Sequence, residues 1–600
     1  MVDKALTGAG QASSVVRTPI FSSAALCVAL GFAAAGPAWA RSPVIVEGAD
    51  EDTRKAILDL LPDRDRPTTL FEAERIAEEA AARATAWLRS EGYYDAEVTQ
   101  QTEENPVSAH LIIAPGQRFR FSAPQLSFDD ATPNDAAHTG ALHALDIVRA
   151  DAPARSIDVL NAESAALAAL QEAGYADAAL GQRRVVVDHA SKRVAADFHF
   201  SAGAPARLGS VRAEPADLFH PGFIRSLRNW RAGETYAPEH VARMRRDLTE
   251  TGAVSRVATR LDPPNADGVR DVVLEVEPAK RNAYELGVGY STNEGVAVEG
   301  QWTRRNFTGR ADALTLSATL GELSQGATAT LTRPHAVGLG HALTIGASAS
   351  HEETDAYARS GAALFASVDA NTRIRFGRSY GLRLAYDTYD NLPDAAVLSG
   401  YGDLRYDTTN FSLDPRSGSI LELRAEPTLS NTGDGGSTIA FLRATAEARH
   451  YRSYGVDQRL TFAARARAGW LQSLTGDLDD APADRRFYAG GGGSVRGYSY
   501  NAIYPHERDT LGLTPGGQGL VEASFEARWR FNGPWGAAAF VDGGNAFESW
   551  SDAAHLRWGA GIGLRYDLGF APLRVDVAVP LDREEAGNNY ALYISIGQAF

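Results

Sequence analysis

The sequence predicts two architectures in one chain: α+β repeats of the pattern β-α-α-β-β, followed by a membrane-spanning antiparallel β-barrel of about 16 strands. Three observations predict it. An apolar segment near the N-terminus is typical of an export signal. A short motif containing glycine occurs three times before residue 280. Alternation of apolar and polar residues then continues to the C-terminus, which indicates strands that are apolar on one face.

The N-terminal segment has the organisation of a signal peptide. Positively charged residues precede the apolar stretch Ile20 to Ala35, and Ala38-Trp39-Ala40 offers a small-x-small cleavage pattern. We therefore predict a signal peptide over residues 1–40. The alternative, an uncleaved membrane anchor, is disfavoured because the stretch is short for a span. The sole cysteine, Cys27, lies in this segment, so the mature chain is expected to contain no disulfide.

Composition narrows the classes of function. The chain has 600 residues and a formal net charge of -16, which argues against a general nucleic-acid binder because phosphate neutralisation needs clustered Lys and Arg. Past Arg41 no run of 18 apolar residues occurs, so no transmembrane helix is expected. An exported chain of this kind is expected in the periplasm, outside the cell, or in a membrane as a β-barrel.

The repeat predicts three small α+β domains. Its glycines, Gly92, Gly174 and Gly252, are 82 and 78 residues apart (174 − 92 and 252 − 174). Each follows a helical pattern, where a left-handed C-terminal cap favours glycine. Strands are expected before the helices at "PVIVEG", "QRFRFSA" and "ARLGSVRA". The three copies are "LRSEGYYDAEV" (Leu88 to Val98), "LQEAGYADAAL" (Leu170 to Leu180) and the weaker "LTETGAVSRV" (Leu248 to Val257), and the predicted domains cover 41–116, 117–204 and 205–279.

Residues 280–600 predict the barrel. In "YELGVGYS" the apolar residues Tyr284, Leu286 and Val288 alternate with polar or small ones, and similar segments recur through about 320 residues (600 − 280). The last segment, "NYALYISIGQAF", puts Ile594, Ile596 and Phe600 on one apolar face, with Gln598 as its exception. A soluble β-sandwich would also alternate, but the export signal and the length favour a lipid-facing barrel with a polar lumen.

One segment of the barrel region has a distinct chemistry. "RFYAGGGGSVRGYSYN" (Arg486 to Asn501) contains four consecutive glycines but lacks the Lys-Ser or Lys-Thr of a phosphate-binding loop. Its guanidinium, on Arg496, has a planar fork of donors that suits carboxylates. Glu526 lies on the polar face of "EASFEARWRF", so alternation directs its carboxylate into the lumen.

These motifs resemble those of the outer-membrane assembly family of BamA and TamA, in which periplasmic POTRA domains precede a 16-stranded barrel. The resemblance is carried by "RRNFTGR" (Arg304 to Arg310), "TRPH", "YDTTNFSLDPRSG", "GGGGSVRGY", "GGQGLVEASFEARW" and "FVDGGNAF". It implies that Val495, Arg496, Gly497 and Tyr498 lie on a loop that folds into the lumen. It also implies that Arg496 pairs there with Glu526 and Asp542.

The resemblance further implies a route for client chains. POTRA domains bind extended chains by strand addition at a sheet edge, although passive spacing remains an alternative. The first and last barrel strands would pair weakly at a seam formed here by "ELGVGYS" and "SIGQAF", with Gly287, Gly289, Gly597 and Phe600 at the join. We expect client strands to enter by templated pairing at this seam.

Three repeats resemble TamA-like members most, which implies an outer membrane location in a Gram-negative bacterium, with the POTRA domains in the periplasm. The implied partners are a TamB-like protein anchored in the inner membrane, unfolded outer-membrane clients such as autotransporters, and outer-membrane lipid, without nucleic acid. A two-partner secretion exporter, which usually has two POTRA domains and a plug helix, and a passive porin stay as alternatives. Because no histidines converge with a nucleophile and no H-E-x-x-H motif occurs, we expect no catalysis, no metal and no cofactor.

Overall fold

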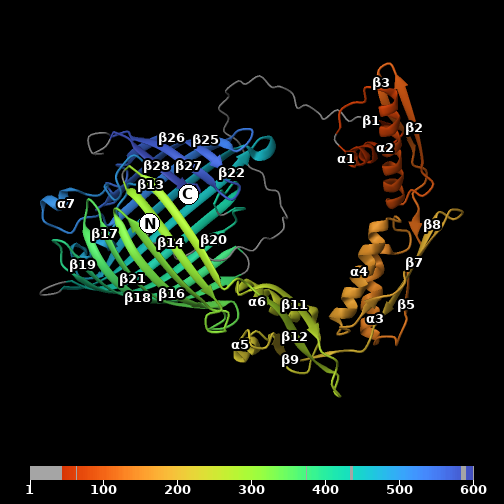
Figure 1. Cartoon of the computed structure of the whole chain (residues 1–600), viewed down its shortest axis with the longest axis horizontal. Coiled ribbons are helices and arrows are strands. Elements are labelled where there is room, and N and C mark those ends of the chain that lie inside the picture. The colour runs from red at the N-terminus through yellow and green to blue at the C-terminus, as the bar shows by residue number, and fades with distance from the viewer. Residues whose placement is uncertain are drawn as a thin grey trace. The chain divides into compact units, whose positions relative to one another are not determined.

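The computed structural model describes residues 44–62, 64–292, 294–372, 375–411, 413–432, 437–582, 589–598 and 600. The predicted signal peptide lies outside these residues. The chain divides into two compact units, of which the second contains Leu274–Phe600 and the first contains most of the preceding sequence. Three α/β domains come first along the chain, and strands β13 to β28 follow (Figure 1).

The first α/β domain packs two helices on a three-stranded sheet. It comprises β1 (Val44–Glu47), α1 (Glu51–Asp59), α2 (Leu70–Ser90), β2 (Glu97–Glu104) and β3 (Val107–Ala114), and the sheet order is β1-β3-β2. The side chain of Thr69 accepts a hydrogen bond from the Glu72 amide, which caps the start of α2. The buried face of α2 has helical spacing and meets the inner face of β3, where Leu111 is buried.

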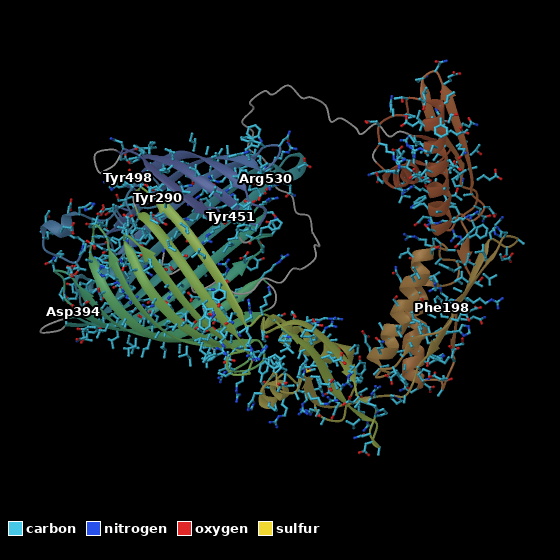
Figure 2. All side chains as sticks on the ribbon, in the orientation of Figure 1. Phe198, Tyr290, Asp394, Tyr451, Tyr498 and Arg530 are labelled. Atoms are coloured by element: carbon cyan, nitrogen blue, oxygen red, sulfur yellow. The ribbon has the colours of Figure 1, made fainter. Side chains whose placement is uncertain are left out.

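The second domain has the same order with one difference from the prediction. It comprises β4 (Arg120–Phe121), β5 (Gln125–Phe128), α3 (Asp135–Ala144), α4 (Ser156–Glu172), β6 (Ala179–Leu180), β7 (Arg184–Asp188) and β8 (Arg193–Ser201). The expected first strand, "QRFRFSA", forms only the two-residue β4, and the longer parallel partner of β8 is β5. Pro124, between them, lacks the amide that a continuous ladder needs. Phe198 of β8 is fully buried in the core (Figure 2).

The third domain repeats the pattern with an added short strand. It comprises β9 (Arg207–Glu214), α5 (Pro221–Ser226), β10 (Glu234–Thr235), α6 (Pro238–Glu250), β11 (Val254–Leu261) and β12 (Val269–Pro278), in the sheet order β10-β9-β12-β11. The expected strand "ARLGSVRA" is β9. All three domains therefore have two helices between their first strand and their last two long strands.

The three repeat glycines follow the second helix of each domain in the left-handed region. Their φ angles are 95° at Gly92, 101° at Gly174 and 69° at Gly252. The carbonyl of Gly92 accepts a hydrogen bond from the Phe119 amide at 2.8 Å, and that of Gly174 accepts one from the Ala206 amide at 2.9 Å. Because Phe119 and Ala206 lie where the next domain begins, the turns at Gly92 and Gly174 also contact the following domain.

The second half is a closed antiparallel barrel of 16 strands in sequence order, as predicted. No helix among the described residues is both long and apolar enough to cross a membrane. The strands are β13 (Asn282–Ser291), β14 (Gly295–Arg305), β15 (Ala313–Gly321), β16 (Ser324–Arg333), β17 (His341–Glu353), β18 (Ala358–Thr372), β19 (Phe376–Tyr389), β20 (Ala395–Asp407), β21 (Gly418–Thr432), β22 (Ser437–Tyr454), β23 (Leu460–Thr475), β24 (Gly519–Arg530), β25 (Trp535–Phe547), β26 (Arg557–Asp567), β27 (Pro572–Pro580) and β28 (Ala591–Ile596).

Alternation along the strands separates an apolar outer wall from a polar lumen. On β24, Phe525 and Trp529 are exposed on the outer face, whereas Glu526 and Arg528 are buried on the inner face. On β13 the outward residues Tyr284 and Leu286 are each 77% exposed. An apolar exterior of this kind fits a lipid environment, because strands joined into a barrel pair most of their backbone groups with one another.

Two of the motifs quoted for the resemblance form turns in the second compact unit. Within "RRNFTGR", the Asn306 side chain donates to the Leu218 carbonyl at 2.8 Å and accepts from the Ala311 amide at 3.0 Å. In "TRPH", a ring nitrogen of His335 lies 3.2 Å from the Asp247 carbonyl oxygen. These turns therefore hold segments of the third α/β domain that belong to the same compact unit.

Candidate functional site

The segment between β23 and β24 packs inside the barrel. Phe487, Val495 and Tyr498 of this loop are buried, in one apolar cluster with Phe441 of β22 and Leu520 of β24. The Arg486 guanidinium is also buried and donates to the carbonyls of Leu478 and Gly516 and to Glu548. The loop is therefore a folded part of the interior, held by an apolar cluster as well as by charge.

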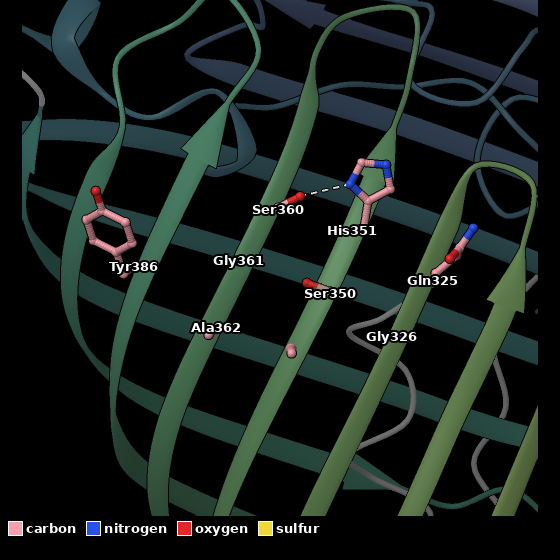
Figure 3. Close-up of a pocket in the computed structure, with 9 residues that line it drawn as sticks. Gln325, Gly326, Ser350, His351, Ser360, Gly361, Ala362 and Tyr386 are labelled. Carbon is pink, nitrogen blue, oxygen red and sulfur yellow. Dashed lines mark hydrogen bonds between the residues drawn. The ribbon is translucent and has the colours of Figure 1, made fainter.

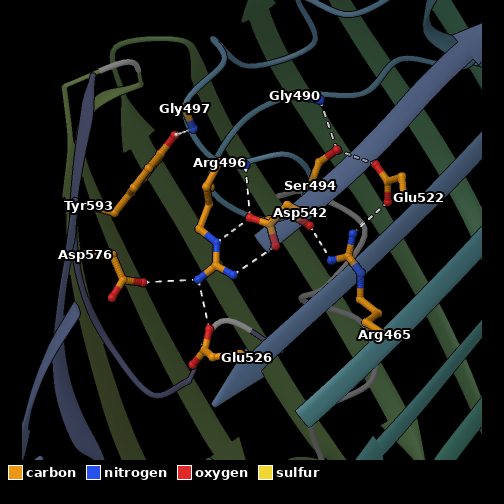
Figure 4. Close-up of polar contacts among 12 residues, drawn as sticks. Arg465, Gly490, Ser494, Arg496, Gly497, Glu522, Glu526, Asp542, Asp576 and Tyr593 are labelled. Carbon is orange, nitrogen blue, oxygen red and sulfur yellow. Dashed lines mark hydrogen bonds and ion pairs between the residues drawn. The ribbon is translucent and has the colours of Figure 1, made fainter. Parts of the chain in front are cut away.

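Arg496 contacts both acids that the resemblance implied (Figure 4). Its Nε donates to Asp542 Oδ2 at 2.7 Å, and its Nη2 donates to Asp542 Oδ1 at 3.0 Å. Nη1 donates to Glu526 Oε2 at 2.9 Å. All three side chains are at most 2% exposed. The pairing with Asp542 is bidentate, a geometry that only the arginine fork provides.

A third carboxylate in this cluster was missed from the sequence. Asp576 of β27 lies 3.3 Å from Arg496 Nη1, and Phe540 of β25 lies under the guanidinium, with 3.4 Å between Cζ and the ring centroid. In the sequence "LRVDVAV" (Leu573 to Val579), Asp576 alternates with valines, which is a signal for a carboxylate on the polar face of its strand. The pairing itself could not be predicted, because it depends on where the loop meets the wall.

Further arginines balance the charge of the carboxylates. Arg528 Nε and Arg565 Nη2 lie 2.9 and 3.1 Å from Glu526 Oε1, and Arg565 also pairs with Asp576. We call Arg496, Glu526, Asp542, Asp576, Arg528 and Arg565 the lumen cluster. Every carboxylate in it has at least one cationic partner, so loss of one member leaves an uncompensated buried charge, which costs roughly 3–5 kcal/mol.

The backbone of the loop approaches the wall where side chains are absent. A Cβ on Gly559 of β26 would lie 2.0 Å from the Arg496 carbonyl oxygen. Gly497 has a φ of 105°, and a Cβ there would lie 2.9 Å from the Pro580 amide nitrogen. On either side of Arg496 and Gly497, Val495 is fully buried and Tyr498 donates to the Trp558 carbonyl at 3.3 Å. The Val-Arg-Gly-Tyr segment can therefore lie close to β26 and β27, because Gly497 in the loop and Gly559 in the wall have no side chains.

The barrel closes through a short seam between β13 and β28. Within the described residues these strands pair at Tyr290 opposite Ile594 and at Ser291 opposite Tyr593. The Thr292 amide adds a hydrogen bond to the Leu592 carbonyl at 2.9 Å. By contrast, β13 pairs with β14 along its whole length, from Asn282 to Ser291. Within the part of the chain that the structure describes, β13 from Asn282 to Gly289 therefore has an edge without ladder pairing to β28.

The predicted seam residues divide into two groups. Gly287 and Gly289 lie on this edge of β13, where Gly287 is opposite Glu299 of β14 and a Cβ on Gly289 would be 4.0 Å from the Ile594 carbonyl oxygen. Gly597 and Phe600 do not lie in the seam ladder, because β28 ends at Ile596. For these two residues the prediction was wrong.

The chain end instead turns into the lumen. Gly597 has a φ of 93°, a conformation that ends the strand. Phe600, predicted on the outer face, is 8% exposed and packs with Tyr451, Ile420 and Ala463, all on the inner wall. Its carbonyl accepts from Arg528 Nη2 at 3.1 Å. Packing of the Phe600 ring against cations and an apolar wall favours this turn over continuation of the strand. Alternation along the sequence does not reveal such a contact.

His351 of β17 lies on the outer wall. It borders a shallow hollow of about 500 Å³ with Gln325, Ser360 and Tyr386 (Figure 3), and its Nδ1 lies 2.9 Å from Ser360 Oγ. It is exposed near the end of β17. Among the residues that the structure describes, no group of His, Cys, Asp or Glu side chains could hold a metal ion.

The first two α/β domains are joined by a polar and aromatic junction. Asp95 pairs with Lys192 and with His189, and Arg118 Nη2 lies 2.8 Å from Glu91 Oε2. The hydrogen bond from Lys192, and then that from His189, lower the pKa of Asp95. Phe119 packs edge-on against Tyr94 of the first domain, with 5.3 Å between ring centroids. These contacts restrict the relative motion of two domains within the first compact unit.

Comparison with known proteins supports this architecture. Residues 290–600 match the Omp85 superfamily domain. The outer membrane protein assembly factor BamA of Nitratidesulfovibrio vulgaris is 24% identical over 93% of this chain and 73% of its own length. The structure of BamA from Haemophilus ducreyi lacking POTRA domains 1–3 has a TM-score of 0.65 at 18% identity, over 80% of this chain and all of that one. The chain belongs to the Omp85 superfamily, with its barrel in the outer membrane of a Gram-negative bacterium and its POTRA domains in the periplasm.

Proposed function

We propose that this protein is a TamA-like assembly factor, which inserts or exports client β-proteins such as autotransporters. The client would first bind to the POTRA domains by strand addition and would then enter the membrane by pairing with the barrel seam. Membership of the Omp85 superfamily and similarity to an outer membrane protein assembly factor support the general role. The reaction is one of hydrogen-bond exchange, and no catalytic or cofactor chemistry is proposed.

The single observation that carries this proposal is the difference between the two edges of β13. One edge is fully paired with β14, whereas the edge toward β28 is paired at Tyr290 and Ser291. An unpaired strand edge presents amide and carbonyl groups that can template an incoming strand. Gly287 and Gly289 place no side chains on the sheet face beside that edge, so an incoming strand meets none there. A client strand could therefore add to β13 with little loss of existing pairing.

The POTRA domains offer edges of the same kind. In the first domain β2 (Glu97–Glu104) is an edge strand, and its residues from Thr99 onward are exposed. Backbone pairing to such an edge is insensitive to side-chain identity, which suits a factor with many clients. A TamB-like inner-membrane partner is part of the proposal, and outer-membrane lipid is the medium into which clients pass.

The presence of three α/β domains favours the TamA-like assignment over a two-partner secretion exporter, for which two would be usual. A direct test is insertion of a radiolabelled autotransporter barrel into liposomes that contain the purified protein. The proposal predicts faster insertion than in empty liposomes, together with capture of a large inner-membrane-anchored partner from envelope extracts. Secretion of a single dedicated exoprotein, with no effect on autotransporters, would support the exporter instead.

A further inference from the structure

The glycine run has a role that the Arg496 contacts do not account for. Arg496 contacts β24, β25 and β27, but glycines on both sides of it in the sequence face the seam. The Gly492 amide donates to Glu294 Oε1 at 2.7 Å, and Glu294 lies in the turn between β13 and β14. The Gly497 amide donates to the Tyr593 hydroxyl at 3.1 Å, and Tyr593 lies on β28 (Figure 4). One loop therefore contacts both sides of the seam from inside.

The glycines are needed for these contacts. A Cβ on Gly491 would lie 2.9 Å from Glu294 Oε1, and a Cβ on Gly492 would lie 3.0 Å from Tyr593 Cδ1. Gly491 also has a φ of 96°, which a side chain would strain. The loop backbone consequently lies against the two seam residues with no side chain between them. A loop evolved only to place Arg496 would not need bare backbone at Gly491 and Gly492.

Both recipients are themselves fixed to the seam strands. The Glu294 amide donates to Ser291 Oγ at 3.0 Å, and Ser291 is one of the β13 residues that pair with β28. Tyr593 is the residue opposite Ser291, and its ring is 2% exposed beside Phe540, Ala578 and Ala591. The loop contacts therefore reach the residue pair at which the barrel closes.

We propose that the loop tip holds the seam closed from within, through Glu294 on one side and Tyr593 on the other. We call these two hydrogen bonds the seam bridge. Because Gly497 follows Arg496 directly, the lumen cluster determines whether the bridge can form. Glu294 and Tyr593 are thus positioning residues that control seam opening. The role of that opening, entry of client strands, rests on the proposed function.

Hydrogen exchange of the full chain in lipid nanodiscs tests the bridge without any client. Exchange of ladder amides is proportional to the population of the open state, so peptides that contain Thr292 or Leu592 report on the seam. Loss of a hydrogen bond to a charged acceptor predicts about tenfold faster exchange there in Glu294→Ala, and loss of a neutral one about fivefold in Tyr593→Phe. Peptides from β17 to β19 are expected to keep wild-type rates, which also shows that the barrel is folded.

Tyr504→Phe is the matched control, because the Tyr504 hydroxyl donates within the loop, to Asp509 Oδ2 at 3.0 Å, and not to the seam. It should leave seam exchange unchanged. Unchanged seam exchange in Glu294→Ala and Tyr593→Phe would overturn the seam bridge, as would equal acceleration in β17 to β19. Faster seam exchange with unaltered client insertion would support the bridge and contradict the proposed function, so the two failures are distinguishable.

Discussion

Arg496 and Asp542 form a bidentate ion pair in the barrel lumen, with the Nε–Oδ2 distance at 2.7 Å and the Nη2–Oδ1 distance at 3.0 Å. This pair joins the loop between β23 and β24 to strand β25 of the barrel wall. Because both groups are buried, removing one partner lowers the stability of the barrel by more than the intact pair adds to it.

The first prediction concerns this pair. Arg496→Ala should destabilise the folded barrel by about 3–5 kcal/mol, because Asp542, Glu526 and Asp576 would remain buried with one cation fewer. Arg496→Lys should recover little, since an ammonium cannot reproduce the bidentate contact. Heat-dependent mobility of the folded barrel in gels measures the loss. Wild-type heat stability of Arg496→Ala would contradict the assignment.

The second prediction concerns the buried chain end. Arg528 donates to the Phe600 carbonyl and lies near its ring, so Arg528→Gln should release the C-terminus from the lumen. Carboxypeptidase should then remove Phe600 at a rate several times that of the wild type. Arg530→Gln, on the same strand but hydrogen-bonded to the Gln458 carbonyl, is the matched control and should keep Phe600 protected. Equal digestion of both variants would refute the contact.

The third prediction tests the seam as a route. Tyr290→Cys with Ile594→Cys places thiols on residues that face each other across the seam. Oxidation should stop client insertion into liposomes, and reduction should restore it. Ser348→Cys with Ala363→Cys joins β17 and β18 in the same way within a continuous ladder and should have no effect. Full insertion activity in the oxidised seam variant would argue for another route.

The fourth prediction is a pH dependence at the junction of the first two domains. The pKa of Asp95 is lowered in the folded protein, so its contribution to stability is present above its unfolded pKa, near 4, and is lost as the pH falls further through the folded value. Spin labels at Glu78→Cys and Asn161→Cys should give a narrow distance distribution at pH 6 and a broad one at pH 2. Asp95→Asn should be broad at both, and a narrow distribution at pH 2 would count against the junction.

The fifth prediction compares two repeat glycines. Both Gly92 and Gly252 have positive φ angles, which cost an alanine about 1 kcal/mol. A Cβ on Gly92 would in addition lie 2.9 Å from the Ala154 carbonyl oxygen, whereas a Cβ on Gly252 would have no atom within 4 Å. Gly92→Ala should therefore accelerate hydrogen exchange in its own domain more than Gly252→Ala does. The reverse order would contradict this account.

Period-two alternation determined much of what the sequence could predict. It located the barrel, because every strand has one lipid face and one lumen face, and it directed Glu526 inward. Helical spacing with a following glycine located the three α/β domains. The identity of Arg496 as the paired cation came from resemblance to a family, not from spacing.

Long-range packing accounts for what the sequence could not predict. Phe600 continues the apolar face of its strand, yet Gly597 turns the chain and Arg528 receives the end inside the lumen. Asp576 and the seam contacts of Glu294 and Tyr593 depend on where a buried loop meets the wall. Those positions follow from the three-dimensional closure of the barrel. The local periodicity of the sequence carries no information about them.

The central claim, that the loop lies inside the barrel against β25 and β26, can be tested by crosslinking in native membranes. A Cβ on Gly544 would lie 2.7 Å from Val495 Cγ2, so Val495→Cys with Gly544→Cys should form a disulfide in intact cells. The account predicts efficient crosslinking, with Val495→Cys alone unreactive toward a membrane-impermeant maleimide. No crosslink, together with rapid labelling of Val495→Cys from outside the cell, would contradict it.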